Sequence, residues 1–327
     1  MLPPRFVRRL VLTPLLFAVA IAAVAASPLL LLIGVVAAGH RHRLLRVVVL
    51  TVCWLALECA VLTTCLGLWV AGGSTETVRA RHYALCGWLL ARVDAVAART
   101  LGLVVEIQEP LGVVPGRPVI VLSRHGGPGD SLLIVHYLLN VYGRRPRIVM
   151  KAALQLDPTA DVLLNRLPNA FVPPNGSASR EGIVDEIGRL ATGIGPADAL
   201  LIFPEGGNFT PRRRVRAIRR LRRQGRRDAA ERARNMANVL PPRPAGSLAA
   251  IDAAPQADIV FVAHTGVDDL MTAGDIWRSI PLDRPLRARW WWVPREEIPE
   301  DGREQWLFDW WEKIDAWIAD NRPRSAV

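Results

Sequence analysis

The chain has 327 residues, of which 51% are hydrophobic, and it carries a formal net charge of +11. This length allows one sizeable α/β domain with a smaller appendage, and the apolar content points first to membrane segments. The charge is concentrated, because residues 212–234 hold twelve arginines against Asp228 and Glu231. Such a block excludes a uniformly basic protein and predicts an anionic partner at one place. The four cysteines form no C-x-x-C pair and predict neither a disulfide framework nor a metal site.

Two apolar runs occupy the N-terminal third. Residues 10–39 contain no charged side chain, and residues 47–73 form a second run interrupted only by Glu58. A helix over the first run would be about 45 Å long, more than the roughly 30 Å hydrocarbon core of a bilayer. Pro28, after Ser27, predicts a kink or break near its middle. Together the runs predict a membrane-anchoring helical hairpin.

Arginines flank both runs, at Arg5, Arg8, Arg9, Arg41, Arg43, Arg46, Arg79 and Arg81. If both helices crossed the membrane, the middle cluster would lie outside, against the positive-inside tendency. A hairpin that dips into one leaflet would keep every cluster cytoplasmic, and both arrangements stay open. We predict that residues 1–76 are the anchor and residues 77–327 the catalytic domain. The expected location is a bacterial cell membrane, with the catalytic domain facing the cytoplasm.

The rest of the chain alternates short apolar strands with helices. Strands are predicted at 101–108, 118–123, from 147, 170–174, 199–202 and 257–266, with an edge strand at 284–294. Helices are predicted at 130–143, 179–190 and 301–320. This alternation predicts the α/β class, with a mostly parallel central sheet flanked by helices. The membrane-embedded helical hairpin precedes it.

Two strand ends lead into polar loops that contain glycine, SRHGGPGD after 118–123 and FPEGGNFT after 199–202. Ligand sites of open α/β sheets form where strands end, so both loops are expected to face one crevice. His125 is a candidate proton acceptor that Asp130 would orient. Asp130 is also a candidate cap for the following helix. The spacing alone leaves a general base, a phosphate-accepting nucleophile and a plain turn open.

The two loops together resemble the glycerolipid acyltransferases, a family that includes the 1-acylglycerol-3-phosphate acyltransferases. Their hallmark is H-x-x-x-x-D, here His125 and Asp130, followed by F-P-E-G, here Phe203, Pro204, Glu205 and Gly206. The family also tends to carry an N-terminal membrane hairpin. One branch has a proline-arginine element like residues 238–243, and a late tryptophan- and lysine-containing helix like 306–315.

The resemblance implies acyl transfer from acyl-CoA or acyl carrier protein to the hydroxyl of a lysophospholipid, in the first place 1-acylglycerol-3-phosphate. His125 would be the general base and Asp130 its orienting partner. The acceptor would be bound by Phe203, Pro204, Glu205, Gly206, Thr210 and Lys151. Backbone N–H groups of the glycine loop are candidate oxyanion donors. Neither a cofactor nor a metal is expected; the expected partners are the two substrates and a bilayer with anionic headgroups, and no nucleic acid.

Two departures from the family pattern concern the acceptor. Many relatives read E-G-T-R, whereas Gly207 and Asn208 follow here, and the F-I-x-R element falls on residues 171–174 without its arginine. Substitutes for the missing phosphate-binding arginines would be Lys151, Arg166 or Arg180. Acylation of a different glycolipid or lysophospholipid therefore remains an alternative.

Rival functions predict different essential residues. R-H-G after a strand also fits a histidine phosphatase, with His125 as nucleophile and His264 as the second histidine. That function would make Arg124 essential and Asp130 dispensable, and it explains neither F-P-E-G nor the hairpin. A lipase would require a G-x-S-x-G elbow, which the chain lacks. A non-enzymatic membrane scaffold is the remaining alternative.

The arginine-rich insert, residues 211–236, contains no aromatic residue that could stack on bases. A helix on an anionic membrane surface is favoured, with Val215, Ile218 and Leu221 on one side. The alternative is a disordered basic insert.

Overall fold

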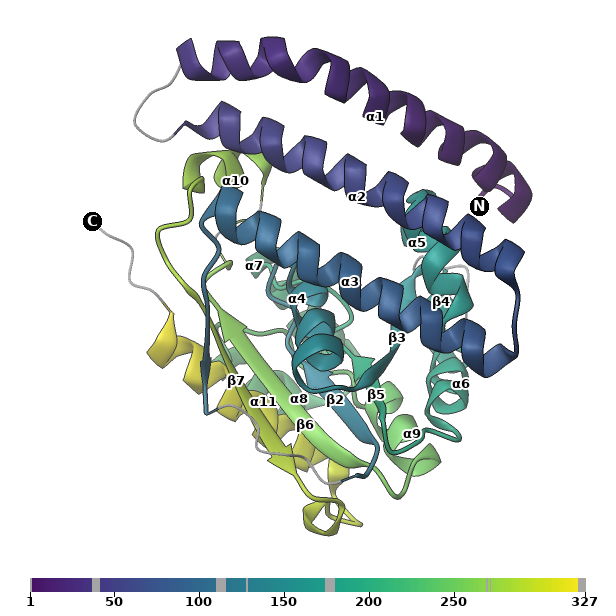
Figure 1. The fold of residues 1–327 in the computed structure, drawn as a ribbon. Helices are drawn as coiled ribbons and strands as arrows, with labels where there is room; N and C mark the ends of the chain where they lie inside the picture. The colour runs from purple at the N-terminus through teal and green to yellow at the C-terminus, as the bar shows by residue number, and fades with distance from the viewer. Residues whose placement is uncertain are drawn as a thin grey trace. The chain divides into compact units, whose positions relative to one another are not determined.

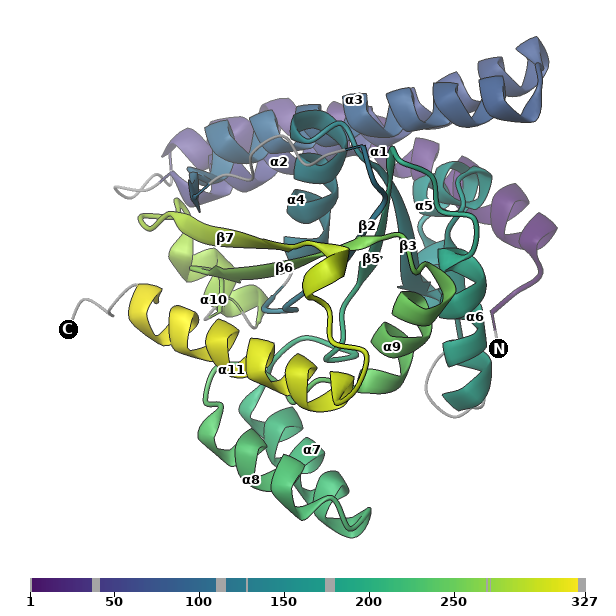
Figure 2. The ribbon, with the colours of Figure 1, turned by 90° about the horizontal axis from the view of Figure 1, so that it is seen from below.

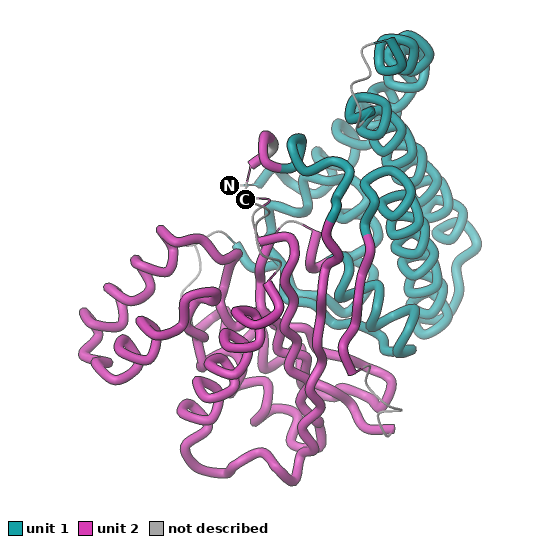
Figure 3. The backbone as a smooth tube through the Cα atoms, turned by 90° about the vertical axis from the view of Figure 1, so that its left-hand side faces the viewer, with its two compact units in different colours: residues 1–103, 132–178, 276–283 teal, residues 104–131, 179–275, 284–327 magenta. Residues whose placement is uncertain are grey.

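The computed structural model describes residues 2–36, 42–109, 116–127, 129–173, 180–268, 270 and 272–322. The chain forms two compact units, each built from three segments of sequence (Figure 3). Unit one contains residues 1–103, 132–178 and 276–283. Unit two contains residues 104–131, 179–275 and 284–327. The functional division after residue 76 stays a prediction, because compactness does not test what a segment does.

Unit one begins with three long helices, α1 (Arg5–Val36), α2 (Arg43–Ala71) and α3 (Thr75–Leu101), which run side by side in Figure 1. By length and composition, α1 and α2 could each cross a membrane. The predicted break at Pro28 does not occur, and α1 continues through it. Pro28 has no N–H for the carbonyl of Val24, and the Ser27 hydroxyl donates to that carbonyl instead, at 2.8 Å.

The other elements of unit one are short. They are most of α4 (Asp130–His136), a π-helical turn (Tyr137–Val141), β3 (Arg145–Lys151), 3-10 turns at Ala152–Leu156 and Leu164–Arg166, α5 (Pro158–Leu163), β4 (Ala170–Val172) and most of α10 (Ala273–Ser279). Strands β3 and β4 pair in parallel. The helix predicted over 130–143 is thus α-helical only in its first part.

Unit two contains the strands β1 (Val105–Gln108), β2 (Val119–Ser123), β5 (Asp198–Ile202), β6 (Asp258–Thr265) and β7 (Leu286–Val293), in the order β1-β7-β6-β2-β5. Strand β2 pairs in parallel with both β5 and β6. Every residue of β2 and of β6 is buried, as expected for central strands covered on both faces. The predicted α/β class with mostly parallel strands, preceded by two long apolar helices, is confirmed.

Two strand predictions need correction. The first strand starts at Val105 rather than at residue 101, because Gly102 has a φ of +72° and ends α3. The edge position predicted for residues 284–294 is wrong, since β7 pairs in parallel with β1 and antiparallel with β6. Arg287 of β7 binds Glu106 of the neighbouring β1 at 3.2 Å.

The helices of unit two are α6 (Arg180–Ala191), α7 (Pro211–Arg223), α8 (Arg227–Asn235), α9 (Pro244–Ala253) and α11 (Arg303–Asn321), with a 3-10 turn at Arg295–Glu297. Helix α11 packs on β6, where Trp310 stacks on Phe261 with 4.3 Å between ring centroids. Helices α7 and α8 form a hairpin beside α11 (Figure 2). The arginine-rich insert is therefore helical, and the alternative of disorder is wrong.

Candidate active site

His125 and Asp130 lie together at the end of β2. The His125 Nδ1 is 2.9 Å from the Asp130 Oδ2, although five positions separate the residues. This bond leaves Nε2 as the ring nitrogen that can accept a proton. The His125 side chain is 17% exposed, whereas that of Asp130 is 1% exposed. A reachable imidazole with a buried carboxylate behind it is the arrangement of an oriented general base.

The chain folds tightly around the Asp130 carboxylate. Its Oδ2 also accepts hydrogen bonds from the backbone N–H groups of Gly126 at 2.9 Å and Gly127 at 3.3 Å. Burial by itself would raise the pKa of Asp130, but the hydrogen bond from His125, the charges of the nearby histidines and the Gly127 N–H lower it to about 2. Asp130 is therefore a carboxylate at neutral pH. Since the Gly126 and Gly127 N–H groups bind Asp130, they are poor candidates for oxyanion donors.

Asp130 is the first residue of α4, so it does not precede the helix as the predicted cap would. Its Oδ1 accepts from the backbone N–H of Ser131 at 2.6 Å and from the Ser131 hydroxyl at 3.1 Å. A typical N-cap instead accepts from the second or third helical residue. The start of α4 and the orientation of His125 thus depend on the same carboxylate.

Glu205 joins the two motif loops. It is 1% exposed, and its Oε1 accepts from the backbone N–H of His125 at 3.3 Å while its Oε2 accepts from that of Leu240 at 3.1 Å. The Phe209 N–H donates to the His125 carbonyl at 2.8 Å. The prediction that the two loops come together is confirmed. Burial raises the pKa of Glu205 to about 8, opposed by the charge of Arg124 and the two N–H donors.

Phe203 and Gly206 complete the second loop. The Phe203 ring lies 4.5 Å from the His125 ring, centroid to centroid, and limits its rotation. Gly206 has a φ of +70° and donates its N–H to the Phe203 carbonyl at 3.0 Å, which closes a turn. Pro204 is buried, and its carbonyl accepts from the backbone N–H of Arg243 at 2.9 Å. Three parts of the chain therefore meet at His125.

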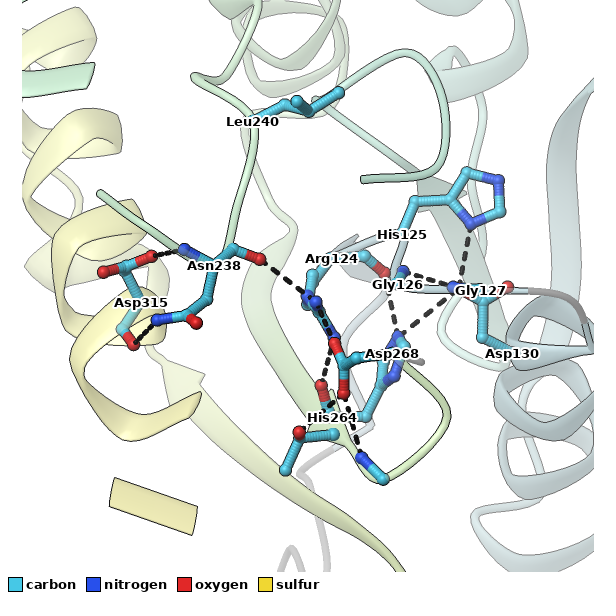
Figure 4. A network of polar contacts seen from close by, with 12 residues as sticks. Arg124, His125, Gly126, Gly127, Asp130, Asn238, Leu240, His264, Asp268 and Asp315 are labelled. Atoms are coloured by element: carbon cyan, nitrogen blue, oxygen red, sulfur yellow. Dashed lines mark hydrogen bonds and ion pairs between the residues drawn. The ribbon is translucent and has the colours of Figure 1, made fainter. Parts of the chain in front are cut away.

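A buried network lies behind the His125–Asp130 pair (Figure 4). Arg124 is 1% exposed and donates to the carbonyls of His264 at 2.6 Å and Asn238 at 3.0 Å, and it pairs with Asp268. The His264 Nε2 lies 3.2 Å from the Arg124 carbonyl oxygen and 3.5 Å from the Asp130 Oδ2. Burial lowers the pKa of His264, so its ring is favoured in the neutral form. The network holds the strand end from which His125 projects.

Gly126 is enclosed by this network, and Gly126→Ala is expected to cost stability and activity together. A Cβ there would lie 2.9 Å from the His264 Cε1 and equally close to the Arg124 Cζ. Since Arg124 is held on several sides, the loop must shift, at a cost of about 1–3 kcal/mol. Thermal unfolding and acyl-transfer rates measure both effects. Gly116→Ala, at a glycine with open space around it, is the matched control. If Gly126→Ala and Gly116→Ala had equal stability and activity, the close packing described around Gly126 would be contradicted.

Comparison with known proteins identifies the domain. Residues 104–245 match the family model described as Acyltransferase. The matched residues include both motif loops, with His125, Asp130 and Glu205. The crystal structure of the 1-acyl-sn-glycerophosphate acyltransferase PlsC from Thermotoga maritima has the same fold, with a TM-score of 0.54 and 13% identity over 86% of this chain and 100% of that one. The resemblance to the glycerolipid acyltransferase family is confirmed. Among curated protein sequences, none shows significant similarity to this chain.

The other predicted substrate-binding residues that the structure describes do not join the cluster of contacts around His125. Thr210 caps α7, where its hydroxyl oxygen accepts from the Arg213 N–H at 3.1 Å. Lys151 ends β3 and Arg166 ends a 3-10 turn, both in unit one. The Arg180 side chain and Pro174 lie outside the described residues. A direct role for any of them in binding the acceptor stays a prediction.

Sequence reasoning missed the buried network around Arg124. Asn238, which binds Arg124, is itself held by Asp315 of α11, whose Oδ1 accepts its backbone N–H at 2.6 Å. The available signal was a third polar strand end, A-H-T-G, with Asp268 two residues beyond it. Among the residues the structure describes, no group of three or more histidine, cysteine, aspartate or glutamate side chains is arranged to hold a metal ion.

The network argues against the phosphatase alternative. That function needs Arg124 and His264 to face a substrate phosphate, yet both side chains are buried, at 1% and 3% exposure. The guanidinium of Arg124 is bound to two carbonyls and to Asp268. His264 does lie beside the catalytic pair, as that alternative expected, but behind Asp130.

Proposed function

We propose that the protein transfers a fatty acyl group from acyl-CoA or acyl carrier protein to the hydroxyl of a lysophospholipid, with 1-acylglycerol-3-phosphate as the first candidate acceptor. The observation that carries the proposal is the His125–Asp130 pair held against the F-P-E-G turn inside an acyltransferase domain. Asp130 has no route to the substrate except through His125, because it is buried and fully engaged. The pair therefore acts as one base.

The reaction follows from the free nitrogen of His125. Its Nε2 takes the proton of the acceptor hydroxyl while the hydroxyl oxygen attacks the thioester carbonyl carbon. The tetrahedral intermediate collapses, the carbon–sulfur bond breaks, and the proton passes from His125 to the departing thiolate. The products are an ester and a thiol. Asp130 stabilises the imidazolium that exists between the two proton transfers.

Arg243 and Arg213 support a phosphate-bearing acceptor. The Arg243 guanidinium lies across Gly206, where an added Cβ would be 2.8 Å from its Cζ. Arg213 lies over Gly207 and donates to the Asn208 carbonyl at 3.0 Å. Both side chains are exposed, and both border the turn that holds His125. They supply, from other sequence positions, the cationic groups that the family motifs lack here.

Arg243→Gln is expected to raise the KM for a phosphate-bearing acceptor about 10–100-fold, because a charge-assisted hydrogen bond of about 1.5–3 kcal/mol is lost. The KM for the acyl donor should stay unchanged. Initial rates with 1-acylglycerol-3-phosphate, compared with those for a monoacylglycerol lacking phosphate, separate the two effects. An equal loss with both acceptors would show that Arg243 supports the turn and does not bind phosphate.

Contacts within unit one support insertion of the hairpin into one leaflet. Asp161 of α5 binds Arg8 at 2.6 Å and Arg9 at 2.9 Å. Thr159, on the same helix, donates to Glu58 in the middle of α2 at 2.8 Å. A crossing helix with a bilayer around its midpoint would not have a polar segment packed there. The exposed apolar face of α1, which includes Leu10 and Ile21, would enter the lipid.

An acceptor panel tests the proposed function. Full-length protein in mixed micelles would receive labelled acyl-CoA or labelled acyl carrier protein and a series of lysophospholipids, monoacylglycerols and glycolipids. We expect labelled diacyl product from at least one phosphate-bearing acceptor. If no lipid in the panel is acylated with either donor, the proposal fails.

A further inference from the structure

One side of α7 carries a row of arginines. Arg212, Arg216, Arg219 and Arg223 follow one another at intervals of four, three and four residues. At 3.6 residues per turn they lie on one side of the helix, over a length of about 17 Å. All four side chains are exposed. We call these four residues the arginine stripe.

Contacts on the opposite side of α7 hold the helix in an orientation that exposes the stripe to solvent. Ile218 and Leu221 are buried there. Arg214, on the same side, donates to the carbonyls of Met236 and Arg234, both at 2.6 Å. Since this side is packed and bonded within unit two, α7 cannot turn to bury the stripe without unpacking.

Two other arginines of the hairpin have acidic partners on α11. Arg226 pairs with Glu304, and Arg232 binds Glu312 at 2.6 Å and Asp309 at 2.5 Å. Figure 2 shows α8 beside α11, the helix that carries all three acidic residues. For the part of the chain that the structure describes, the stripe residues have no hydrogen-bond or ion-pair partner. Their charges are therefore available to a separate anion.

The stripe also weakens the helix that carries it. Like charges three and four residues apart repel on a helix surface. The first turn of α7 has no acidic residue, so Arg212 meets the positive end of the helix dipole. When residues destabilise their own helix and no other part of the fold compensates for the loss, a role at a functional surface is expected.

We propose that the arginine stripe docks the acyltransferase domain on a layer of anionic lipid headgroups. A straight row on a convex helix fits an extended array of phosphates, whereas a small anion would need a concave site. Val215, beside the stripe, is 42% exposed and adds little apolar surface. The contact is therefore electrostatic and sensitive to salt. This proposal rests on the proposed function in one respect, that the acceptor is a membrane lipid.

Two other polyanions are less favoured. Single-stranded nucleic acid is bound by stacking as well as charge, and residues 211–236 contain no aromatic side chain. An acidic protein such as acyl carrier protein would be attracted by the same charges. The lipid surface is preferred because two long apolar helices of the same chain are suited to a membrane. The acidic protein is retained as an outcome of the test.

Arginine footprinting of the full-length protein tests the proposal. The protein would be reconstituted in nanodiscs of phosphatidylcholine alone or with about a third phosphatidylglycerol, treated with phenylglyoxal, and mapped by mass spectrometry. We expect the stripe to be protected only with phosphatidylglycerol, and the protection to disappear in high salt. Arg227 and Arg234, exposed on α8, should react equally in both. Equal modification of the stripe in both nanodiscs would overturn the proposal.

Paired variants sharpen the test. Replacing Arg216 and Arg219 with glutamine should lower the ratio of docked to undocked protein about 30-fold, measured by protection of Arg212 and Arg223. The matched pair Arg227→Gln and Arg234→Gln should leave it unchanged. Protection in neutral nanodiscs by added acyl carrier protein, without any by phosphatidylglycerol, would replace the lipid with an acidic protein. Acyl transfer is assayed separately. If the stripe is not protected but acyl transfer is normal, the docking proposal fails and the proposed function stands.

Discussion

Replacing His125 with alanine is expected to lower the kcat of acyl transfer about 10²–10⁴-fold, the usual contribution of a positioned general base. The loss follows from the geometry, because the His125 Nε2 is the proton acceptor that the Asp130 bond leaves available. The side chain is partly exposed, and its recorded side-chain contacts are with Asp130 and the Phe203 ring. Thermal unfolding should therefore change little, and steady-state rates in mixed micelles measure the effect.

Asp130→Asn is the informative companion to this variant. Its single amide oxygen can replace only one of the two carboxylate oxygens that accept from Gly126 and Ser131, and it carries no charge to stabilise the imidazolium. We expect a large loss of kcat with a near-normal KM. Because the pKa of Asp130 is about 2, wild-type activity should not lose this carboxylate at any pH above about 4. Full transfer activity in Asp130→Asn, together with phosphatase activity, would support the rival function.

The second large effect is expected at Glu205, which supports the site and is not proposed to react. Glu205→Ala removes the acceptor for two buried backbone N–H groups, those of His125 and Leu240. Each unsatisfied donor costs about 1–3 kcal/mol, so the free energy of unfolding should fall by roughly 2–6 kcal/mol. That is a large share of a typical domain stability of about 5–15 kcal/mol. Denaturant unfolding in detergent measures it.

Glu205→Gln is the matched control, since it keeps the shape and one acceptor oxygen. It should destabilise the protein less than alanine does. The folded pKa of Glu205, about 8, is raised above the ordinary value of 4.5, so the fold favours its protonated form. The stabilisation that comes from this preference is complete below about pH 4.5 and is lost as the pH rises through 8. The stability of the wild type relative to Glu205→Gln should fall over that range; a difference that rises would contradict the assignment.

The sequence predicted that His125 and Asp130 act together because the signals for the pair are local. Both motifs follow apolar strands, and parallel neighbours end at the same edge of a sheet, so His125 and Glu205 had to meet once β2 and β5 paired. Asp130 could be assigned two roles from its place between a glycine loop and a helix. The structure shows the carboxylate bound to His125, and bound to the N–H of the next residue, Ser131, where a typical cap would bind a later N–H.

Features that depend on pairing between distant segments could not be predicted in this way. Arg124 and His264 are 140 positions apart and meet only because β6 lies beside β2. The position of β7 between β1 and β6 also depends on tertiary pairing. Its arginines are compatible with an edge strand and equally with an inner strand in which an arginine binds an acidic residue of β1. The orientation of Arg243 across Gly206 depends on a backbone bond to Pro204, far away in sequence.

The central claim is that the His125–Asp130 pair moves an acyl group and leaves the acceptor phosphate in place. One substrate tests it directly: 1-acylglycerol-3-phosphate labelled with ³²P, incubated with wild-type protein and with His125→Ala, each with and without acyl-CoA or acyl carrier protein bearing the acyl group. We expect the label to move into a diacyl phospholipid only with wild type and only when a donor is present. Release of labelled orthophosphate without a donor, abolished by His125→Ala, would contradict it.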